Sequence, residues 1–182
     1  MDIQILSHKF RDYSQYIKGF SPETLRRYRQ VINYYCNFAN IKDTEEITKE
    51  NTRNLFYHGR TNQQWTTNTF ICYHKSLVVF FRWCVKEGHM TSNPMDDIEV
   101  PKLEKRLPPK LNKQEAMRIL EVVDNYPYDS QFLRYRNYAI FATFIMAGLR
   151  KKELLSLKCT DIEIENLSIF IRQGKGNKDR VA

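Results

Sequence analysis

AGLRKKELLSL, residues 147–157, and IRQGKGNKDR, residues 171–180, decide the fold class of this chain. In the first segment, Gly148 is expected to end one helix, and Arg150 to begin a short helix that runs through Leu157. In the second segment a glycine-rich turn follows an alternating apolar pattern, which is typical of a β-hairpin. The change from helical to strand period predicts an α+β domain.

The sequence on either side extends this domain to residues 111–182. Asn112 and Glu115 have the spacing of a capping box at a helix start. The helix from about Ser130 to Ala147 is apolar nearly all round in its second half, which predicts that it is buried. Two strands are expected around a turn, and a third begins at Asp179, so the sequence stops in what should be mid-strand. The apolar strand positions are Ile162, Ile164, Leu167, Ile169 and Ile171.

Basic residues in the two segments suit the chemistry of phosphate groups. A guanidinium at a helix start, that of Arg150, can give two hydrogen bonds to a phosphate that gains charge. Glu153 lies one turn further along the same face, where it could orient Arg150. Lys175 lies between two glycines, and its ammonium could protonate a leaving oxygen. The plain alternatives are a solvated Arg–Glu pair and an ordinary hairpin turn.

Residues 1–90 predict an all-helical domain. Ser21 has the place of an N-cap, with Pro22 at the first helical position. Apolar residues then recur at helical spacing: Leu25, Tyr28, Val31, Ile32, Tyr35, Cys36 and Ala39. A second helix is expected from about Thr48 to His58, and a third from about Thr67 to Glu87.

The third of these helices has two distinct faces. Its predicted core face consists of Phe70, His74, Leu77, Val78, Phe81 and Val85, and Phe80 and Trp83 are also expected in the core. Its other face presents Asn68, Lys75, Arg82 and Lys86, and no acidic residue occurs between Trp65 and Lys86. This face is therefore a candidate for binding an anionic partner.

Proline and charge distribution divide the chain. Four of its six prolines fall between Gly88 and Lys110, which predicts a linker at 91–110. The net charge of the 182 residues is +8, and the pI is about 9.3, which favours nucleic acid over other partners. Residues 1–100 carry 13 Lys and Arg against 11 Asp and Glu, whereas residues 101–182 carry 16 against 10.

Several classes of protein are not expected. The four cysteines and four histidines form no metal-binding spacing, so no metal and no cofactor are predicted. No apolar stretch is long enough to cross a bilayer, and the first twenty residues do not resemble a signal peptide. The sequence thus predicts a cytoplasmic protein with no membrane partner.

The two opening segments, in this order and spacing, resemble the start of the catalytic domain of tyrosine recombinases, the phage integrases and Xer-type resolvases. In that family a G-L-R-x-x-E-L helix start supplies a catalytic arginine, and a G-K-G-x-K-x-R hairpin supplies a catalytic lysine. Residues 1–90 resemble the family's helical, SAM-like core-binding domain, in which S-x-x-T-x-x-x-Y opens one helix and FFRW closes another. The expected fold is therefore mainly α, an all-helical domain followed by an incomplete α+β domain with a small antiparallel sheet.

The resemblance assigns roles to individual residues. Arg150 and Lys175 correspond to catalytic residues, Lys175 being the general acid, and Glu153 supports Arg150. The partners it implies are double-stranded DNA and other recombinase protomers, which form tetramers on paired sites. The residues expected to contact DNA are Ser21, Thr24, Arg26, Arg27, Asn68, Thr69, Lys75, Arg82, Lys178 and Arg180.

Other parts of the family's machinery are missing from this sequence. Relatives attack DNA with a tyrosine, forming a 3′-phosphotyrosyl intermediate, and use an H-x-x-R box. None of the eleven tyrosines follows Lys175, and no H-x-x-R occurs. The sequence thus predicts a recombinase fragment that binds DNA without cleaving it. The alternatives are a non-catalytic helical DNA-binding protein, a truncated integrase that competes with a complete one, and a protein-interaction module.

Overall fold

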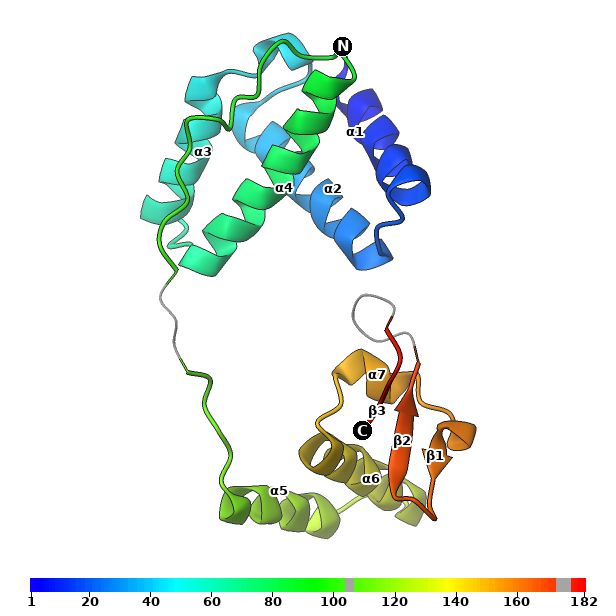
Figure 1. Ribbon diagram of the computed structural model, residues 1–182. Coiled ribbons are helices and arrows are strands. Elements are labelled where there is room, and N and C mark those ends of the chain that lie inside the picture. Colours follow the sequence, from blue (N-terminus) through cyan, green and yellow to red (C-terminus); the bar gives the residue numbers. More distant parts are fainter. Residues whose placement is uncertain (104–106, 173–177) are drawn as a thin grey trace. The chain divides into compact units, whose positions relative to one another are not determined.

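The chain forms two units (Figure 1). The computed structural model describes residues 1–103, 107–172 and 178–182, and its contacts separate Met1–Arg106 from Leu107–Ala182. The first unit is built from helices, and the second combines helices with a small antiparallel sheet. The predicted fold class is therefore confirmed.

The described residues of the first unit form four α-helices, together with a π-helical segment and a 3₁₀ turn. The α-helices are α1 (Ile3–Asp12), α2 (Pro22–Ala39), α3 (Lys49–Thr61) and α4 (Thr67–Lys86). Each helix is preceded by a capping residue whose side-chain oxygen accepts a hydrogen bond from a backbone N–H of the first helical turn. This bond satisfies a donor that has no partner inside the helix. These caps are Asp2, Ser21, Thr48 and Thr66. The predicted helices correspond to α2, α3 and α4, but the sequence analysis assigned no helix before Ser21, and α1 was missed.

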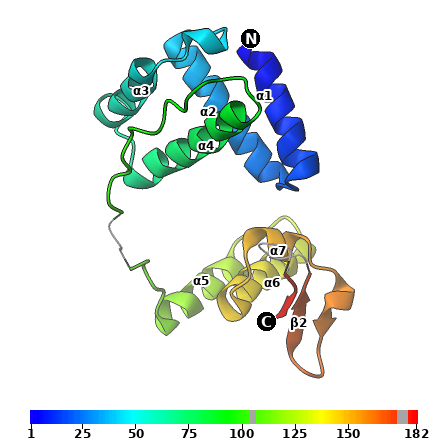
Figure 2. The same cartoon turned by 45° about the horizontal axis from the view of Figure 1, so that its top comes forward.

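The core of the first unit lies between α1, α2, α3 and α4, and α2 and α4 cross in both views (Figures 1 and 2). On α2 the buried residues are those that the periodicity predicted, with Leu25 and Ala39 only half-buried. On α4 the prediction was partly wrong, because His74, Val78 and Val85 are half-buried. The buried residues of α4 are Phe70, Ser76, Leu77, Phe80, Phe81, Trp83 and Cys84.

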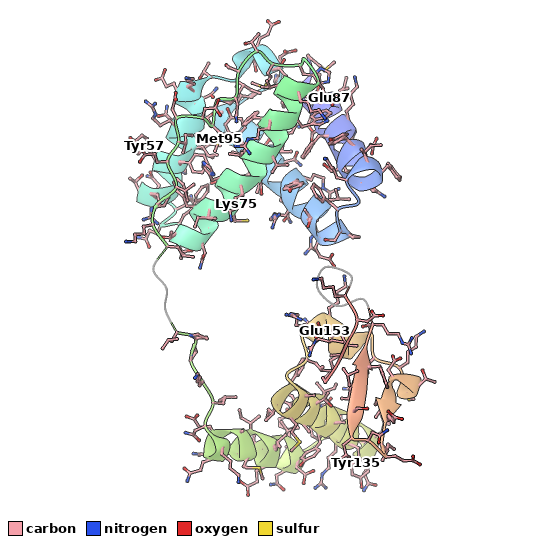
Figure 3. The ribbon with its side chains drawn as sticks, in the orientation of Figure 1. Tyr57, Lys75, Glu87, Met95, Tyr135 and Glu153 are labelled. Carbon is pink, nitrogen blue, oxygen red and sulfur yellow. The ribbon has the colours of Figure 1, made fainter. Side chains whose placement is uncertain are left out.

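Part of the predicted linker packs against the first unit. Met95 is only 2% exposed, and its backbone N–H donates to the side-chain oxygen of Asn93 at 3.0 Å. Nε2 of His74 on α4 lies 2.9 Å from the carbonyl oxygen of Ile98. Figure 3 labels Met95 beside the helices. The division into 1–90, 91–110 and 111–182 stays a prediction, and the structure adds that residues 93–98 lie on the helical unit.

One glycine of α3 makes room for an aromatic side chain. A Cβ at Gly59 would lie 2.3 Å from Cε3 of Trp65, and the centre of that ring lies 4.1 Å from the centre of the Tyr73 ring. We expect Gly59→Ala to lower the free energy of unfolding by about 1–3 kcal/mol, because the ring would have to move. Urea unfolding followed by circular dichroism measures this loss. Gly88→Ala is no control because its φ is positive, whereas Thr61→Ala, on the same helix and exposed, should have a much smaller effect.

The second unit begins with three helices, α5 (Lys113–Asn125), α6 (Gln131–Ala147) and α7 (Lys151–Leu155). The capping box predicted at the start of α5 is present, with Asn112 and Glu115 exchanging two hydrogen bonds of 2.8 Å. The sheet has the order β1 (Ile162–Glu163), β2 (Ser168–Ile171) and β3 (Arg180–Val181), all antiparallel. Ile162 pairs with Ile169, and Ile171 pairs with Arg180.

The prediction that α6 is buried was wrong. No residue of α6 is buried, and Phe132, Tyr135 and Met146 are 71%, 61% and 74% exposed. The helix packs on α5 and α7, and an ion pair between Arg134 and Asp124 joins it to α5. A helix that is apolar on every side needs neighbours on every side, and these two cover only part of its surface. Tyr135 accordingly projects from the helix in Figure 3.

Candidate functional site

The start of α7 fixes the position of Arg150. Gly148 ends α6 with a φ of 59°, a left-handed conformation that glycine adopts without steric cost. Leu149 is then buried, and Arg150 becomes the N-cap residue of α7. The chain thereby leaves one helix and starts the next within three residues. The Arg150 side chain stays 59% exposed although its backbone is anchored.

Glu153 holds Arg150 by two hydrogen bonds. The backbone N–H of Arg150 donates to Oε2 at 2.9 Å, and its Nη1 donates to Oε1 at 2.8 Å. The Glu153 side chain is only 5% exposed, so this carboxylate is shielded from water on most sides. The guanidinium of Arg150 has further N–H groups, and because the side chain is 59% exposed these can donate to an anion.

A second arginine reaches the same carboxylate. Nη2 of Arg180, on β3, donates to Oε2 of Glu153 at 3.0 Å. The sequence indicated phosphate contact for Arg180 and did not foresee this bond, because the two residues are 27 positions apart. One acid therefore holds two guanidinium groups from different elements. Glu153 is labelled in Figure 3 beside α7.

These contacts lower the pKa of Glu153 to about 2 from its ordinary 4.5, chiefly through the Arg150 backbone hydrogen bond and then the two arginine side chains. A lowered pKa means that the carboxylate stabilises the fold above pH 4.5 and that this contribution is lost as the pH falls towards 2. We expect the Glu153 carboxyl signal in NMR to titrate near pH 2, and Glu153→Gln to remove that step. A midpoint at 4.5 would contradict this geometry.

A further ion pair that the sequence analysis missed supports the hairpin. Asp161 is 4% exposed, and its carboxylate accepts from Nε of Arg172 at 2.8 Å and from the backbone N–H of Lys158 at 3.1 Å. The second of these bonds closes a 3₁₀ turn, Cys159–Asp161, ahead of β1. Asp161 therefore ties the end of β2 to the start of the sheet. Its only sequence signal is an acid at the third position of this turn.

Lys175 lies outside the described residues. The strands on either side of it are paired, since Phe170 faces Val181 and Ile171 faces Arg180. The paired positions Ile171 and Arg180 therefore bracket the segment that contains Lys175. Lys178, which the sequence analysis predicted to contact a DNA phosphate, is exposed.

The predicted DNA-contacting residues of the first unit lie on α2 and α4. Arg26, Arg27, Asn68, Lys75 and Arg82 are all exposed. The three hydroxyl residues have capping contacts. Ser21 and Thr24 lie 3.1 Å apart through their side-chain oxygens at the start of α2, and Thr69 makes a 3.0 Å contact of the same kind with Thr66 at the start of α4. The structure thus shows that these hydroxyls help to define the two helix starts.

No group of three or more potential metal ligands occurs within residues 1–103, 107–172 and 178–182. Over the same residues, no helix combines the length and the apolar character needed to span a bilayer.

Comparisons with known proteins agree with this arrangement. The N-terminal SAM-like domain of phage integrases matches residues 6–89, and the phage integrase family matches residues 109–182. The tyrosine recombinase XerC of Bacillus pumilus is 29% identical over 180 residues, which cover 97% of this chain and 57% of that protein. A second XerC, from Ralstonia nicotianae, is 31% identical over 91% of this chain and 49% of its own length.

The chain belongs to the tyrosine recombinase family.

Solved structures of this family share the fold. A lambda integrase tetramer bound to a Holliday junction matches 100% of this chain and 50% of its own, with a TM-score of 0.76 at 18% identity. The match to the Tn1549 transposon integrase in complex with transposon right end DNA covers 100% of this chain and 57% of the integrase chain. Its TM-score is 0.65 at 15% identity. The chain spans about half the length of the curated recombinases that it matches.

Proposed function

We propose that this chain binds double-stranded DNA as part of a site-specific recombinase, with Arg150 holding the phosphate at which strands are exchanged. The observation that carries the proposal is the Arg150–Glu153–Arg180 cluster, in which one buried carboxylate holds two exposed arginines. Phosphoryl transfer concentrates negative charge on the non-bridging oxygens. A fixed guanidinium stabilises that charge without having to reorganise during the reaction.

Within this proposal Glu153 is a positioning residue. It fixes the Arg150 side chain from one side and leaves other N–H groups of the guanidinium for the phosphate. Lys175 is proposed as the general acid for the leaving oxygen, and Lys178 as a phosphate contact. The chemistry needs no metal or cofactor if arginine and lysine provide the charge.

The partners follow from the same proposal. The lambda integrase structures include a dimer on a core site and a tetramer on a Holliday junction, which supports assembly with further protomers on DNA. A protein that acts on chromosomal or phage DNA in a bacterium would work in the cytoplasm.

DNA binding by the 182-residue chain tests the proposal. We expect the logarithm of the association constant for a duplex to fall linearly with the logarithm of salt concentration. Arg150→Ala should reduce that slope by about 0.9, the value for one lost phosphate contact. Fluorescence anisotropy with a labelled duplex measures both the affinity and the slope.

Arg136→Ala is the matched control. Arg136 is exposed in the same unit and donates only to its neighbour Asn137 in the described chain, so its removal changes the net charge equally. If the two variants bind DNA alike, Arg150 has no special contact with a phosphate. If the unmodified chain binds no duplex even at low salt, the DNA-binding proposal itself is wrong.

A further inference from the structure

Residues 93–98 form a strap that packs against the helical unit after α4 has ended. Asn93 and Met95 are 7% and 2% exposed, and Ile98 packs on the core. The Asn93 side chain shapes the strap, because it accepts from the backbone N–H of Met95 and donates to Asp96, each at 3.0 Å. The chain after α4 runs back beside α3 in Figure 1, and Figure 3 labels Met95 in the strap. These residues therefore belong to the folded unit, although the sequence predicted a linker here.

A hydrogen bond from α4 holds the end of the strap. Nε2 of His74 lies 2.9 Å from the carbonyl oxygen of Ile98. A carbonyl oxygen only accepts, so Nε2 carries the hydrogen, and a further proton on the ring would go to Nδ1. The neutral ring already makes this bond, and the charged ring would make it stronger because the donor is then ionised. The strap's tie to α3, a bond of 2.6 Å from Lys49 to Asp97, joins exposed side chains and contributes little.

Burial and two cations of α4 keep His74 in its neutral form. Burial lowers the pKa of His74 below its ordinary 6.5, the bond to Ile98 raises it, and the charges of Arg82 and Lys75 lower it further. Both cations are exposed, on the acid-free face of α4 that is predicted to contact DNA. A neighbouring cation disfavours a second positive charge, so a group that neutralises Arg82 and Lys75 favours protonation of His74.

The other elements around the imidazole are apolar or carry paired charges. On α3, the ring centre of Phe56 lies 6.1 Å from that of the imidazole. Two cations of the same helix, Lys49 and Arg53, act on Asp97 of the strap and lower its pKa. The other acid of the strap, Asp96, is bonded within the strap itself. The cations of α4 are thus the charges to which the imidazole responds.

We propose that duplex DNA bound along α2 and α4 tightens the strap by making His74 take up a proton. The inference rests on the proposed function, together with the phosphate contacts predicted for Lys75 and Arg82. Phosphates would offset the two positive charges that help to keep His74 neutral, and the imidazolium would then hold Ile98 by a charge-assisted bond. Because linkage is reciprocal, protonation of His74 in turn strengthens DNA binding.

The strap decides where the linker leaves the helical unit. While Ile98 is held at His74, the free chain begins there, but without the strap it would begin where α4 ends, at Glu87. These two points of α4 lie about 20 Å apart along the helix axis. A tightened strap leaves fewer residues in the tether to the second unit. As long as the tether still spans the distance, this raises the effective concentration of the second unit at DNA held by the first.

Calorimetric titration with a duplex, repeated in buffers that differ in ionisation enthalpy, counts the protons that the 182-residue chain takes up on binding. We expect uptake at about pH 6, in the range where histidines titrate, and none at about pH 8. His74→Gln should lose most of this uptake, because glutamine keeps an N–H donor for Ile98 but cannot titrate.

The affinity should depend on pH in the same sense. The pKa of His74 lies below 6.5 in the free chain and DNA raises it, so binding tightens as the pH falls through this range. Between about pH 7.5 and 5.5, we expect about threefold more tightening in the unmodified chain than in His74→Gln, the effect of raising one histidine pKa by about 0.5.

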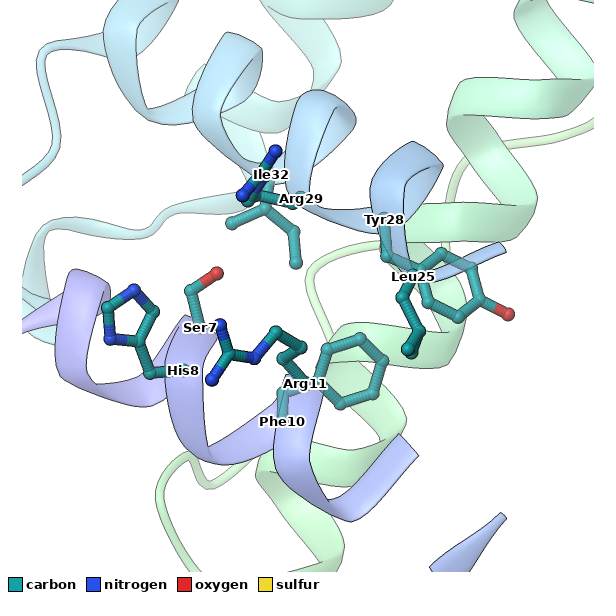
Figure 4. Close-up of a pocket in the computed structure, with 8 residues that line it drawn as sticks. All are labelled: Ser7, His8, Phe10, Arg11, Leu25, Tyr28, Arg29 and Ile32. Carbon is teal, nitrogen blue, oxygen red and sulfur yellow. The ribbon is translucent and has the colours of Figure 1, made fainter. Parts of the chain in front are cut away.

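His8 of α1 provides a control. It lines the small hollow of Figure 4 together with Arg11 and Arg29, so it too lies near cations. Its side chain is exposed and makes no hydrogen bond within the part of the chain that the structure describes. A proton gained by His8 would therefore act on no other segment, and His8→Gln should retain the proton uptake that His74→Gln loses.

A pair of double variants tests the source of the effect. Lys75→Ala/Arg82→Ala should take up few protons even at duplex concentrations that saturate it, because the charges that DNA would offset are gone. Lys9→Ala/Lys42→Ala removes the same charge from exposed positions of the first unit and should retain the uptake. Equal uptake in the two double variants would contradict the proposed coupling.

Amide hydrogen exchange follows the strap itself. The backbone N–H of Ile98 donates to the carbonyl oxygen of Met95 at 3.1 Å, so its exchange reports on the strap. At about pH 6 a duplex should slow this exchange about threefold in the unmodified chain and leave it unchanged in His74→Gln. Duplex binding without proton uptake, or with equal uptake in His74→Gln, would overturn the inference and leave the DNA-binding proposal intact. A chain that binds no duplex at low salt would overturn both.

Discussion

Phe10→Ala is expected to lower the free energy of unfolding of the first unit by about 3–5 kcal/mol, the usual loss for a large aromatic side chain in a core. Phe10 is 2% exposed, and its ring centre lies 5.5 Å from that of Tyr28, 5.2 Å from Phe80 and 5.4 Å from Trp83. It therefore joins α1 to both α2 and α4. Small domains have about 5–15 kcal/mol of stability in total, so this single change should unfold a measurable fraction of the unit.

Tryptophan fluorescence makes the measurement specific. Both tryptophans, Trp65 and Trp83, lie in the first unit, so their emission during urea unfolding reports on that unit. Tyr57→Ala is the control, because Tyr57 is an aromatic residue of the same unit that is 64% exposed. Its loss should stay within about 0.5 kcal/mol. Comparable losses for Phe10 and Tyr57 would show that α1 does not pack as described.

Local signals in the sequence were sufficient for most helices. Ser21 and Asn112 cap helices where they were predicted to, because capping depends on residues within one turn. The same kind of signal was present for α1 and was overlooked. Asp2 accepts from the backbone of Gln4 and Ile5, and Ile3, Leu6 and Phe10 are buried at helical spacing.

The side of α4 that is buried could not be obtained from periodicity alone. This helix has apolar residues on more than one face, so its neighbours decide which of them are covered. Phe80 and Trp83 contact Phe10 of α1, a helix that was not predicted. His74 instead meets the carbonyl oxygen of Ile98, in a segment with no regular period. Burial on α4 is thus a tertiary property.

The same distinction applies to the candidate site. The Arg150–Glu153 contact joins residues three positions apart, and it could be foreseen from the spacing. The bonds from Arg180 to Glu153 and from Arg172 to Asp161 depend on how the strands return towards α7 and the 3₁₀ turn. A sequence pattern does not show which residues of the returning strand face α7 or the 3₁₀ turn. Charge pairs between distant segments were accordingly missed, although each participant is an ordinary acid or arginine.

The second large effect concerns four of the exposed cations of α2 and α4. Replacing all four by alanine should reduce the salt slope of duplex binding by about 3.6, or about 0.9 for each phosphate contact. Between 50 and 200 mM salt, the variant's affinity should then fall about 150-fold less than that of the unmodified chain. The four substitutions are Arg26→Ala, Arg27→Ala, Lys75→Ala and Arg82→Ala, all at exposed positions.

A control with the same change of net charge separates a binding face from a general field. Four other exposed cations of the first unit serve for this purpose: Lys9, Lys42, Lys49 and Arg53. Lys49 pairs with Asp97 at the surface, a contact that contributes little to stability. If the DNA lies along α2 and α4, the control should retain most of the slope, because released counterions come only from phosphates in contact. Equal slopes in the two quadruple variants would mean that the DNA lies elsewhere on the molecule, and that the acid-free face of α4 is an ordinary solvated surface.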